Sequence, residues 1–399
     1  MNELTIEEIY RAQKVLSDVA RHPKIIGPTP LSDTCKIFLK PENLQHTGAF
    51  KLRGAYYKIS QLTPEEREKG VIACSAGNHA QGVALAATHN GIKSLICLPA
   101  GAPNSKIEAT KHYGAEVCLV PGVYDDAYAK AVQLQQEKGY TFVHPFNDPK
   151  VIAGQGTIGL EILEEMPQVD AIVVPVGGGG LISGIAFAVK TLRPDIKVYG
   201  VQAAGAPSMA QSLKERQRVH LDTVSTIADG IAVKEPGDLT FDLCSKYVDD
   251  IVTVNDDEIA AAILALIEKQ KLVAEGAGAS AVAAAMFGKL PLEGKNVVCL
   301  VSGGNIDVNI LNRVINRALL KIGRLCQLEL EVTDKPGTLS QVLKVVAEQG
   351  ANVLSVNHER VSASAQINAC TLHLELETLN REHVERLTAA LAAAGFPAK

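Results

Sequence analysis

The stretch VVPVGGGGL, at residues 173–181, decides the fold class of this chain. An apolar run typical of a buried strand leads into four consecutive glycines, and a helical pattern follows Gly180. Because glycine has no Cβ, the backbone N–H groups of such a loop can close around a phosphate, and the start of the helix adds a favourable dipole. The junction therefore predicts a phosphate-binding loop; a flexible connector is the alternative.

The neighbouring sequence excludes two classes of phosphate-bearing ligand, dinucleotides and nucleoside triphosphates. A dinucleotide site needs an acidic residue near the end of the next strand to bind the ribose. That strand ends in VQAA at residues 201–204, without a carboxylate. The spacing G-x-x-x-x-G-K-[ST] of nucleoside-triphosphate loops is also missing from the sequence. We therefore expect the phosphate monoester of a small cofactor.

Short apolar runs alternate with helical stretches between about residues 70 and 200. Near-continuous apolar strands separated by helices indicate a parallel sheet that is covered on both faces. Ligands bind such sheets in the loops at the carboxyl ends of the strands. The loops that follow residues 74, 98 and 176 are therefore the places where we expect a site.

The composition excludes several other classes of protein. The 399 residues are 47% apolar and 21% charged, which is typical of a globular protein. The formal net charge is −5 and no basic run stands out, so we expect no nucleic-acid partner.

Four glycines and Pro175 interrupt the uncharged stretch at residues 171–189, so we expect no membrane helix there. Eight cysteines stand singly and the charged N-terminus is no signal peptide, so we predict a cytoplasmic protein with free thiols.

Three further motifs each follow a predicted strand and offer polar groups. Lys51, in TGAFKLRGA (47–55), lies in the first turn of a helix that we expect to begin near Ala49. The helix dipole lowers the pKa of an amine placed there and favours a nucleophile, although a solvated surface lysine is the alternative. The loop SAGNH (75–79) suits a carboxylate or phenolate-type oxygen, and for His79 we favour a packing or hydrogen-bonding role over that of a general base. The motif SGGN begins with the hydroxyl of Ser302, which suits a ring nitrogen.

The order and spacing of these four motifs resemble the fold type II family of pyridoxal-phosphate enzymes, and the threonine/serine dehydratase branch in particular. The segment HPFNDPKVIAGQGTIGLEI (144–162) strengthens the resemblance, which extends over about residues 5–320. It implies an α/β architecture of two lobes with mainly parallel sheets. We assign the catalytic domain to residues 1–322 and its smaller lobe to about residues 50–145.

The resemblance also implies a role for each motif. Lys51 would hold pyridoxal 5′-phosphate as an imine and later move protons at the substrate's α carbon, with Phe50 packed near the ring. Asn78 would bond the O3′ oxygen of the cofactor, and Ser302 would face its pyridine nitrogen. The cofactor phosphate would be bound by the glycine loop, made of Gly177, Gly178, Gly179, Gly180 and Leu181. The substrate carboxylate would be received by the loop made of Ser75, Ala76, Gly77, Asn78 and His79.

The implied reaction is an elimination. A serine hydroxyl cannot fully protonate the pyridine nitrogen, so the cofactor is a weaker electron sink and early loss of a β-hydroxyl is favoured over a long-lived carbanion. We expect a threonine ammonia-lyase that forms 2-oxobutanoate and ammonia from L-threonine, and pyruvate from L-serine. The alternatives are a serine dehydratase, a hydroxyaspartate-type ammonia-lyase, or a non-catalytic amino-acid sensor on the same fold.

Two departures from a related branch, the serine racemases, bear on this choice. That branch has a second serine where this chain has Ala76, which has no proton to give, so racemisation is not expected as a main activity. Its divalent-cation site also needs an acidic residue in the stretch that corresponds to residues 202–206, where this chain has none. We therefore assign no metal there.

The sequence pattern changes near residue 323 to a βαββα series. The turn DKPGTL (334–339) between its first strand and first helix resembles that of an ACT domain, which we assign to residues 323–399. Such domains pair with one another and bind amino acids near this turn. Regulation by an amino-acid effector such as isoleucine and a role in assembly alone both stay open. We expect a homodimer or homotetramer, and a short final strand at residues 396–399.

Overall fold

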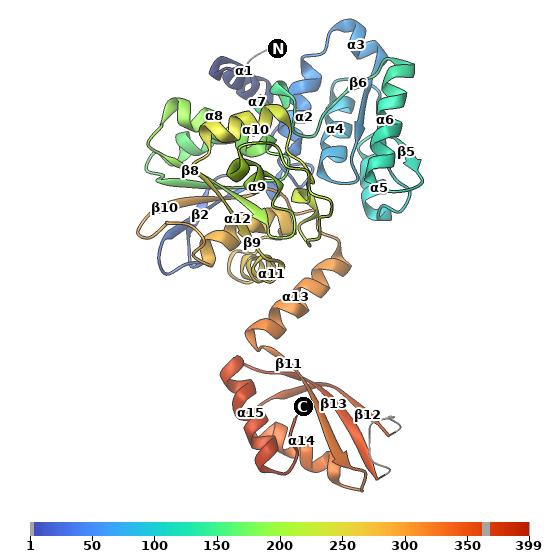
Figure 1. Ribbon diagram of the computed structural model, residues 1–399, viewed down its shortest axis with the longest axis vertical. Helices are drawn as coiled ribbons and strands as arrows, with labels where there is room; N and C mark the ends of the chain where they lie inside the picture. The colour runs from blue at the N-terminus through green and yellow to red at the C-terminus, as the bar shows by residue number, and fades with distance from the viewer. Residues whose placement is uncertain (1–3, 361–367, 399) are drawn as a thin grey trace. The chain divides into compact units, whose positions relative to one another are not determined.

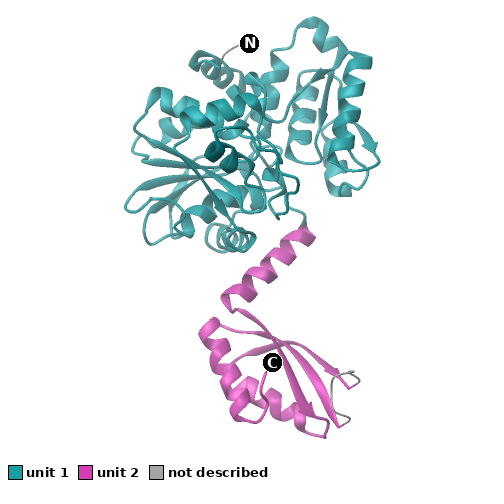
Figure 2. Cartoon of the chain, in the orientation of Figure 1, with its two compact units in different colours: residues 1–307 teal, residues 308–399 magenta. Residues whose placement is uncertain are grey.

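The computed structural model describes residues 4–360 and 368–398, and the chain forms two compact units (Figure 2). The first unit is Met1–Asp307 and the second is Val308–Lys399. This division groups helix α13 (Val308–Ile322) with the second unit, whereas the sequence pattern led us to place the boundary after residue 322.

A six-stranded sheet forms the centre of the larger lobe of the first unit, in the order β1-β2-β10-β7-β8-β9. Only β1 runs antiparallel to its neighbour; the other pairs are parallel. The side chains of β7 are all buried, which explains why its sequence is a continuous apolar run. The strands are β1 (Ile26–Thr29), β2 (Lys36–Pro41), β7 (Ala171–Pro175), β8 (Lys197–Ala203), β9 (Asp250–Val254) and β10 (Asn296–Val301).

A second, fully parallel sheet lies in the smaller lobe, in the order β5-β4-β3-β6. Figure 1 shows helices α4 to α6 around it. Its strands are β3 (Val71–Cys74), β4 (Ser94–Pro99), β5 (Glu116–Val120) and β6 (Thr141–Phe142). The mainly parallel α/β architecture expected from the alternating pattern is therefore confirmed.

The helices of the first unit cover both sheets. They are α1 (Ile6–Leu16), α2 (Lys51–Ser60), α3 (Pro64–Lys69), α4 (Asn78–His89), α5 (Asn104–His112), α6 (Tyr124–Lys138), α7 (Pro149–Glu165), α8 (Gly180–Leu192), α9 (Ser208–Glu215), α10 (Asp238–Tyr247), α11 (Asp256–Ala265) and α12 (Gly276–Met286). Short helical turns lie at η1 (Glu42–Leu44), η2 (Asp229–Ile231) and η3 (Leu266–Gln270). Within the described part of the chain, no helix is both long and apolar enough to cross a membrane.

The second unit contains a three-stranded antiparallel sheet, in the order β11-β13-β12. Apolar side chains of the sheet and of two helices share one core. The expected short final strand is reduced to a single bridge between Leu330 and Ala398. The elements that follow α13 are β11 (Leu325–Thr333), α14 (Thr338–Glu348), β12 (Asn352–Glu359), β13 (Ala369–Glu377) and α15 (Arg381–Ala393).

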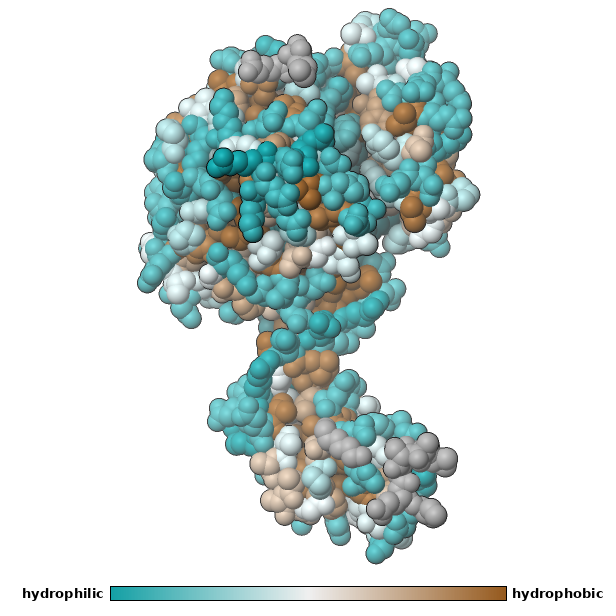
Figure 3. All heavy atoms as spheres, in the orientation of Figure 1, coloured by the Kyte–Doolittle hydropathy of each residue, from teal (hydrophilic) through white to brown (hydrophobic). Residues whose placement is uncertain are grey.

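Helix α13 keeps part of its apolar surface exposed. Figure 3 shows hydrophobic side chains reaching the surface in its region. The exposed fraction of Val308 is 77%, and three more apolar side chains of the helix are also exposed: Ile310, Leu320 and Ile322. These side chains lie near the two ends of the helix.

A buried cluster of charges fixes the helix that carries Lys51. Arg53, on α2, donates from Nε and Nη2 to both carboxylate oxygens of Glu42, at 2.9 and 2.8 Å. It also donates to Glu161 on α7, which is bonded in turn by Lys40 of β2 at 2.8 Å. These hydrogen bonds connect the start of α2 to η1, α7 and β2. All four side chains are buried.

Replacing Arg53 by methionine leaves the two carboxylates without their main partner. We expect Arg53→Met to lower the free energy of unfolding by about 3–5 kcal/mol, because breaking a buried ion pair leaves uncompensated charge. Urea-induced unfolding followed by circular dichroism measures this change. The matched control is Arg193→Met, which removes an exposed pair with Asp195 and should cost less than about 1 kcal/mol. An equal effect of the two variants would show that the buried cluster does not stabilise the fold.

Candidate functional site

The side chain of Lys51 is partly buried, and its amine faces one carbonyl. Lys51 is the first residue of α2, two residues later than the start we expected. Its Nζ donates to the carbonyl oxygen of Pro145 at 2.7 Å and lies 5.3 Å from the centre of the Phe50 ring. Burial lowers the pKa of the amine to about 8, against an opposing effect of the Glu275 carboxylate. Burial, rather than the helix dipole, is therefore the main cause of the low pKa that we predicted for this lysine.

Backbone contacts join the Lys51 segment to the SGGN motif at the end of β10. The N–H of Phe50 donates to the carbonyl of Ser302 at 3.1 Å. Ala49 and Gly303 form an isolated antiparallel bridge, and the N–H of Gly304 donates to the carbonyl of Gly48 at 2.9 Å. Ser302 is only 3% exposed. Two segments about 250 residues apart in the sequence therefore form one wall beside Lys51.

The side chain of Asn305 ties the SAGNH loop to the same wall. The amide of Asn305 donates to Oδ1 of Asn78 at 2.8 Å and to the carbonyl of Thr47 at 2.7 Å. Within the loop, the hydroxyl of Ser75 accepts from the N–H of Gly77 at 3.2 Å. Helix α4 begins at Asn78, so the first amides of the helix lie at this point. Amides in the first turn have no partner within their own helix and are available to a carboxylate.

The glycine loop connects β7 to α8, as the sequence predicted. Gly179 has a φ of +94°, in the region that favours glycine. A Cβ on Gly178 would lie 2.4 Å from the ring of Phe146, and one on Gly180 would lie 2.8 Å from Phe146. The loop therefore has room only for glycine on the side that packs against Phe146. Leu181, the second residue of α8, is buried.

The peptide of Pro145 and Phe146 places the amine and the glycine loop next to one another. Pro145 accepts the bond from Lys51, and the following residue packs on Gly178 and Gly180. His144 shapes this peptide, because its Nδ1 accepts from the N–H groups of Phe146 and Asn147 at 3.3 and 2.8 Å. Burial, together with the nearby lysine, lowers the pKa of His144 to about 4, so the ring is neutral at pH 7.

These residues fit a phosphorylated aldehyde. The amine, which loses its proton near pH 8, can bond to a carbonyl carbon. The bare first-turn amides of α8, approached closely because the loop has no side chains, suit a phosphate. Lys51, the Ser302 segment and the Asn78 loop are connected by the hydrogen bonds given above. The residues present are thus the donor set that pyridoxal 5′-phosphate needs.

His79 is held as a structural residue by its neighbours. It is 3% exposed, and its Nε2 lies 2.8 Å from the carbonyl oxygen of Val143. Burial lowers its pKa to about 3, so it is neutral at pH 7. Its Nδ1 is buried and has no hydrogen-bond partner among the residues that the structure describes. This geometry agrees with the hydrogen-bonding role that we favoured for His79.

The most important residue that the sequence analysis missed is Glu275. It precedes α12, is 6% exposed, and accepts a hydrogen bond from Nδ2 of Asn78 at 2.7 Å. Burial, and then the negative charge of Asp229, raise its pKa to about 7. A signal was present in the sequence, because Glu275 is the one charged residue directly before a long run of small and apolar residues.

Comparisons with known proteins match both units. Residues 23–303 match the family model of pyridoxal-phosphate-dependent enzymes, and residues 325–394 match that of the ACT domain. The L-threonine ammonia-lyase of Thermotoga maritima is 52% identical over 395 residues, which are 98% of each chain.

Solved structures resemble the chain over about four-fifths of its length. The processed form of threonine deaminase isoform 2 from Solanum lycopersicum has a TM-score of 0.75 and 39% identity, and the match covers 78% of this chain and 93% of that one. Maize serine racemase has a TM-score of 0.74 and 36% identity, with 79% and 98% covered.

The family match spans the region in which the four motifs lie, and the structure brings those motifs together around the Lys51 amine. The chain therefore belongs to the family of pyridoxal-phosphate-dependent enzymes of fold type II, and it carries a C-terminal ACT domain.

Proposed function

We propose that this protein is a threonine ammonia-lyase, which eliminates water from L-threonine and releases 2-oxobutanoate and ammonia, and which also converts L-serine to pyruvate. The observation that carries the proposal is the 52% identity to the L-threonine ammonia-lyase of Thermotoga maritima, because it extends over both units. The amine of Lys51 supports a catalytic protein over a non-catalytic sensor on the same fold, since a sensor does not need a nucleophile.

We assign the cofactor contacts to the residues that surround Lys51. Lys51 would hold pyridoxal 5′-phosphate covalently, with Phe50 beside the ring. Asn78 would bond the ring oxygen, and Ser302 would face the ring nitrogen. The backbone of the glycine loop would bind the phosphate, through Gly177, Gly178, Gly179, Gly180 and Leu181. The substrate carboxylate would lie at the start of α4, on the loop of Ser75, Ala76, Gly77, Asn78 and His79.

The protein's own part in the reaction follows from this arrangement. Pyridoxal phosphate, when bound, supplies an electron sink that weakens the bonds at the substrate's α carbon. An amine whose pKa is about 8 can exist without its proton near neutral pH, so Lys51 is suited to accept the α-proton. Ser302 offers a hydroxyl, which is not acidic enough to keep the ring nitrogen protonated. This favours prompt loss of the β-hydroxyl over a long-lived carbanion.

Racemisation is less well supported, although a serine racemase is among the similar structures. Racemisation needs a second group that gives a proton to the opposite face of the α carbon. Ala76, on the loop where the related branch has a second serine, has no proton to give. Elimination therefore remains the main reaction in our proposal.

The second unit supports a regulatory role in this proposal. We assign the catalytic domain to residues 1–322, with its smaller lobe at about residues 50–145, and the ACT domain to residues 323–399. An amino-acid effector such as isoleucine would bind near the turn at Gly337, whose φ of +93° leaves the backbone accessible. The match to the ACT domain supports a homodimer or homotetramer, since such domains are expected to pair with one another. All eight cysteines are free and seven are buried, which supports a reducing compartment such as the cytoplasm.

A product assay with L-threonine beside L-serine tests the proposed function. We expect 2-oxobutanoate and pyruvate respectively, and no build-up of D-amino acid. Lys51→Ala should lower both rates by about 100- to 10,000-fold or more, because it removes the group that moves the proton. The matched control is Lys69→Ala, which removes an exposed lysine of α3 paired only with Glu65. Near wild-type turnover in Lys51→Ala, or racemisation faster than ammonia release, would contradict the proposal.

Glu275 should tune the reactivity of Lys51, because its negative charge raises the pKa of the amine. In the cofactor-free protein, the rate of pyridoxal phosphate uptake should rise with pH through about 8, as the neutral amine is the nucleophile. Glu275→Gln removes the charge and should move this midpoint to lower pH. The absorbance change on uptake, recorded over a pH series, measures both midpoints.

The matched control for this experiment is Glu293→Gln, which removes an exposed carboxylate and should leave the midpoint where it is. A midpoint that is unchanged or higher in Glu275→Gln would show that this carboxylate does not act on Lys51.

A further inference from the structure

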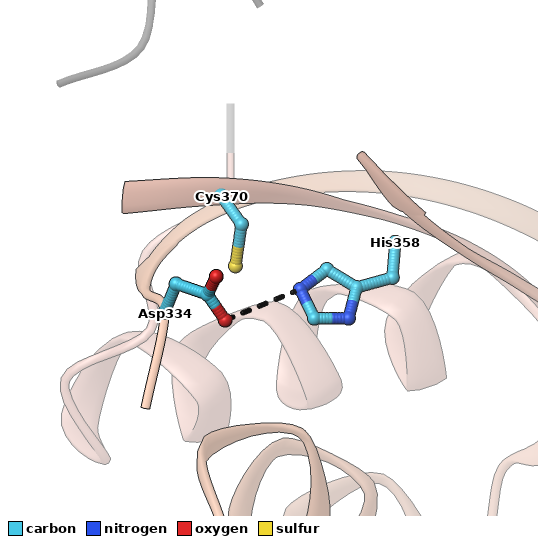
Figure 4. Close-up of side chains that lie close together, drawn as sticks. All are labelled: Asp334, His358 and Cys370. Atoms are coloured by element: carbon cyan, nitrogen blue, oxygen red, sulfur yellow. Dashed lines mark ion pairs between the residues drawn. The ribbon is translucent and has the colours of Figure 1, made fainter. Parts of the chain in front are cut away.

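Three side chains that can ligate a metal meet in the second unit, apart from the site described above (Figure 4). Asp334 directly follows β11, His358 lies on β12 and Cys370 lies on β13. One ligand atom from each residue, an oxygen, a nitrogen and a sulfur, lies within 4.8 Å of the other two. Because β11 and β12 both pair with β13, the sheet itself brings the three positions together.

The spacing of the Asp334 and His358 atoms suits two ligands of one ion. His358 Nε2 lies 3.9 Å from Oδ1 of Asp334, which is too long for a hydrogen bond. Two ligands of a tetrahedral zinc ion, with bonds of about 2.0–2.3 Å, lie about 3.3–3.8 Å apart. Figure 4 shows the imidazole, the carboxylate and the thiol directed toward a common space.

The nitrogen of His358 that faces this space is an unexplained buried polar atom. His358 Nε2 is shielded from solvent and has no hydrogen-bond partner among the described residues. A buried polar atom without a partner is unfavourable, because it has lost its hydrogen bonds to water. Cys370 is only 2% exposed, and its thiol donates to the backbone carbonyl of Val332 at 3.6 Å. An ion at the centre of the three residues would satisfy the imidazole and the thiol together.

Among the described residues, Arg360 makes a further polar contact to Asp334. Arg360 donates from Nε to Oδ2 of Asp334 at 2.9 Å, so it uses the carboxylate oxygen that does not face His358. Such a hydrogen bond to a ligating carboxylate is common around metal sites, where it orients the ligand. Burial, and then the Asp334 carboxylate, raise the pKa of the Cys370 thiol, and the positive charge of Arg360 opposes this shift.

We propose that Asp334, His358 and Cys370 form a binding site for a divalent transition-metal ion of the zinc class. One oxygen, one nitrogen and one sulfur ligand suit zinc and disfavour magnesium and calcium, which prefer oxygen ligands alone. On binding, the Cys370 thiol releases its proton to solvent and bonds as thiolate, while neutral His358 bonds through Nε2. Three protein ligands leave the fourth position to a water molecule.

Zinc binding to the full-length enzyme with its cofactor tests the site. The protein is treated with a chelator, incubated with zinc, freed of unbound metal by gel filtration and analysed by mass spectrometry for metal content. We expect about one zinc per chain in the wild type. Cys370→Ser and His358→Ala should each weaken zinc binding by more than about 100-fold, since even changes outside the ligands cost 10–100-fold. Zinc that is retained equally by these variants, or not retained by the wild type, would overturn the proposal.

Two control variants separate this site from other thiols and imidazoles of the same unit. Cys326→Ser changes another buried cysteine of the same core, and His373→Ala changes an exposed histidine of β13; both should keep the zinc. If Cys370→Ser does not fold, cobalt replaces zinc as the probe in the wild type. A difference spectrum against the metal-free enzyme should then show tetrahedral cobalt bands with a thiolate charge-transfer band. A cobalt spectrum without the thiolate band would contradict ligation by Cys370.

Discussion

The placement of the Lys51 amine, partly buried and bonded to the carbonyl of Pro145, organises the first unit. An ammonium group removed from water is costly, so the protein lowers the pKa of Lys51 to about 8 and gives it one carbonyl partner, that of Pro145. Glu275 limits this shift, because its carboxylate favours the charged form. With a pKa of about 8, the amine can be protonated or neutral near neutral pH. The neutral form is the nucleophile in covalent attachment, and exchange between the two forms is needed for proton transfer.

Several segments of the first unit, distant from one another in the sequence, position the Lys51 amine through hydrogen bonds and packing. The N–H of Phe50 donates to the carbonyl of Ser302, and the amide of Asn305 donates to Oδ1 of Asn78. These hydrogen bonds join the Lys51 segment, the SGGN motif and the SAGNH loop into one surface. Behind them, the buried ion cluster of Arg53 fixes the helix that begins at Lys51. On the other side, Phe146 packs on glycines that leave no space for a Cβ. Apart from the bond between Arg53 and Glu42, these contacts join residues that are far apart in the chain, so the site forms only when the whole unit is folded.

The sequence predicted the elements far better than the contacts between them. Apolar runs are local signals, and the run that leads into the glycine loop is the fully buried strand β7. The glycine loop was equally clear, because its conformation depends on residue type. Glu275 was missed, since its role comes from a hydrogen bond to Asn78, almost 200 residues away. The cause of the low pKa of Lys51 was also misjudged, because burial depends on segments such as Pro145 that a pattern near Lys51 does not reveal.

Trapping the imine by reduction shows which lysine binds the cofactor, which we assign to Lys51. Borohydride delivers hydride to an imine and converts it to a stable amine, which fixes the cofactor to its lysine. After reduction of the enzyme and digestion with a protease, mass spectrometry locates the modified peptide. In the reduced enzyme, we expect a pyridoxyl group on Lys51 and on no other lysine. An adduct on a different lysine, with the Lys51 peptide unmodified, would contradict this assignment.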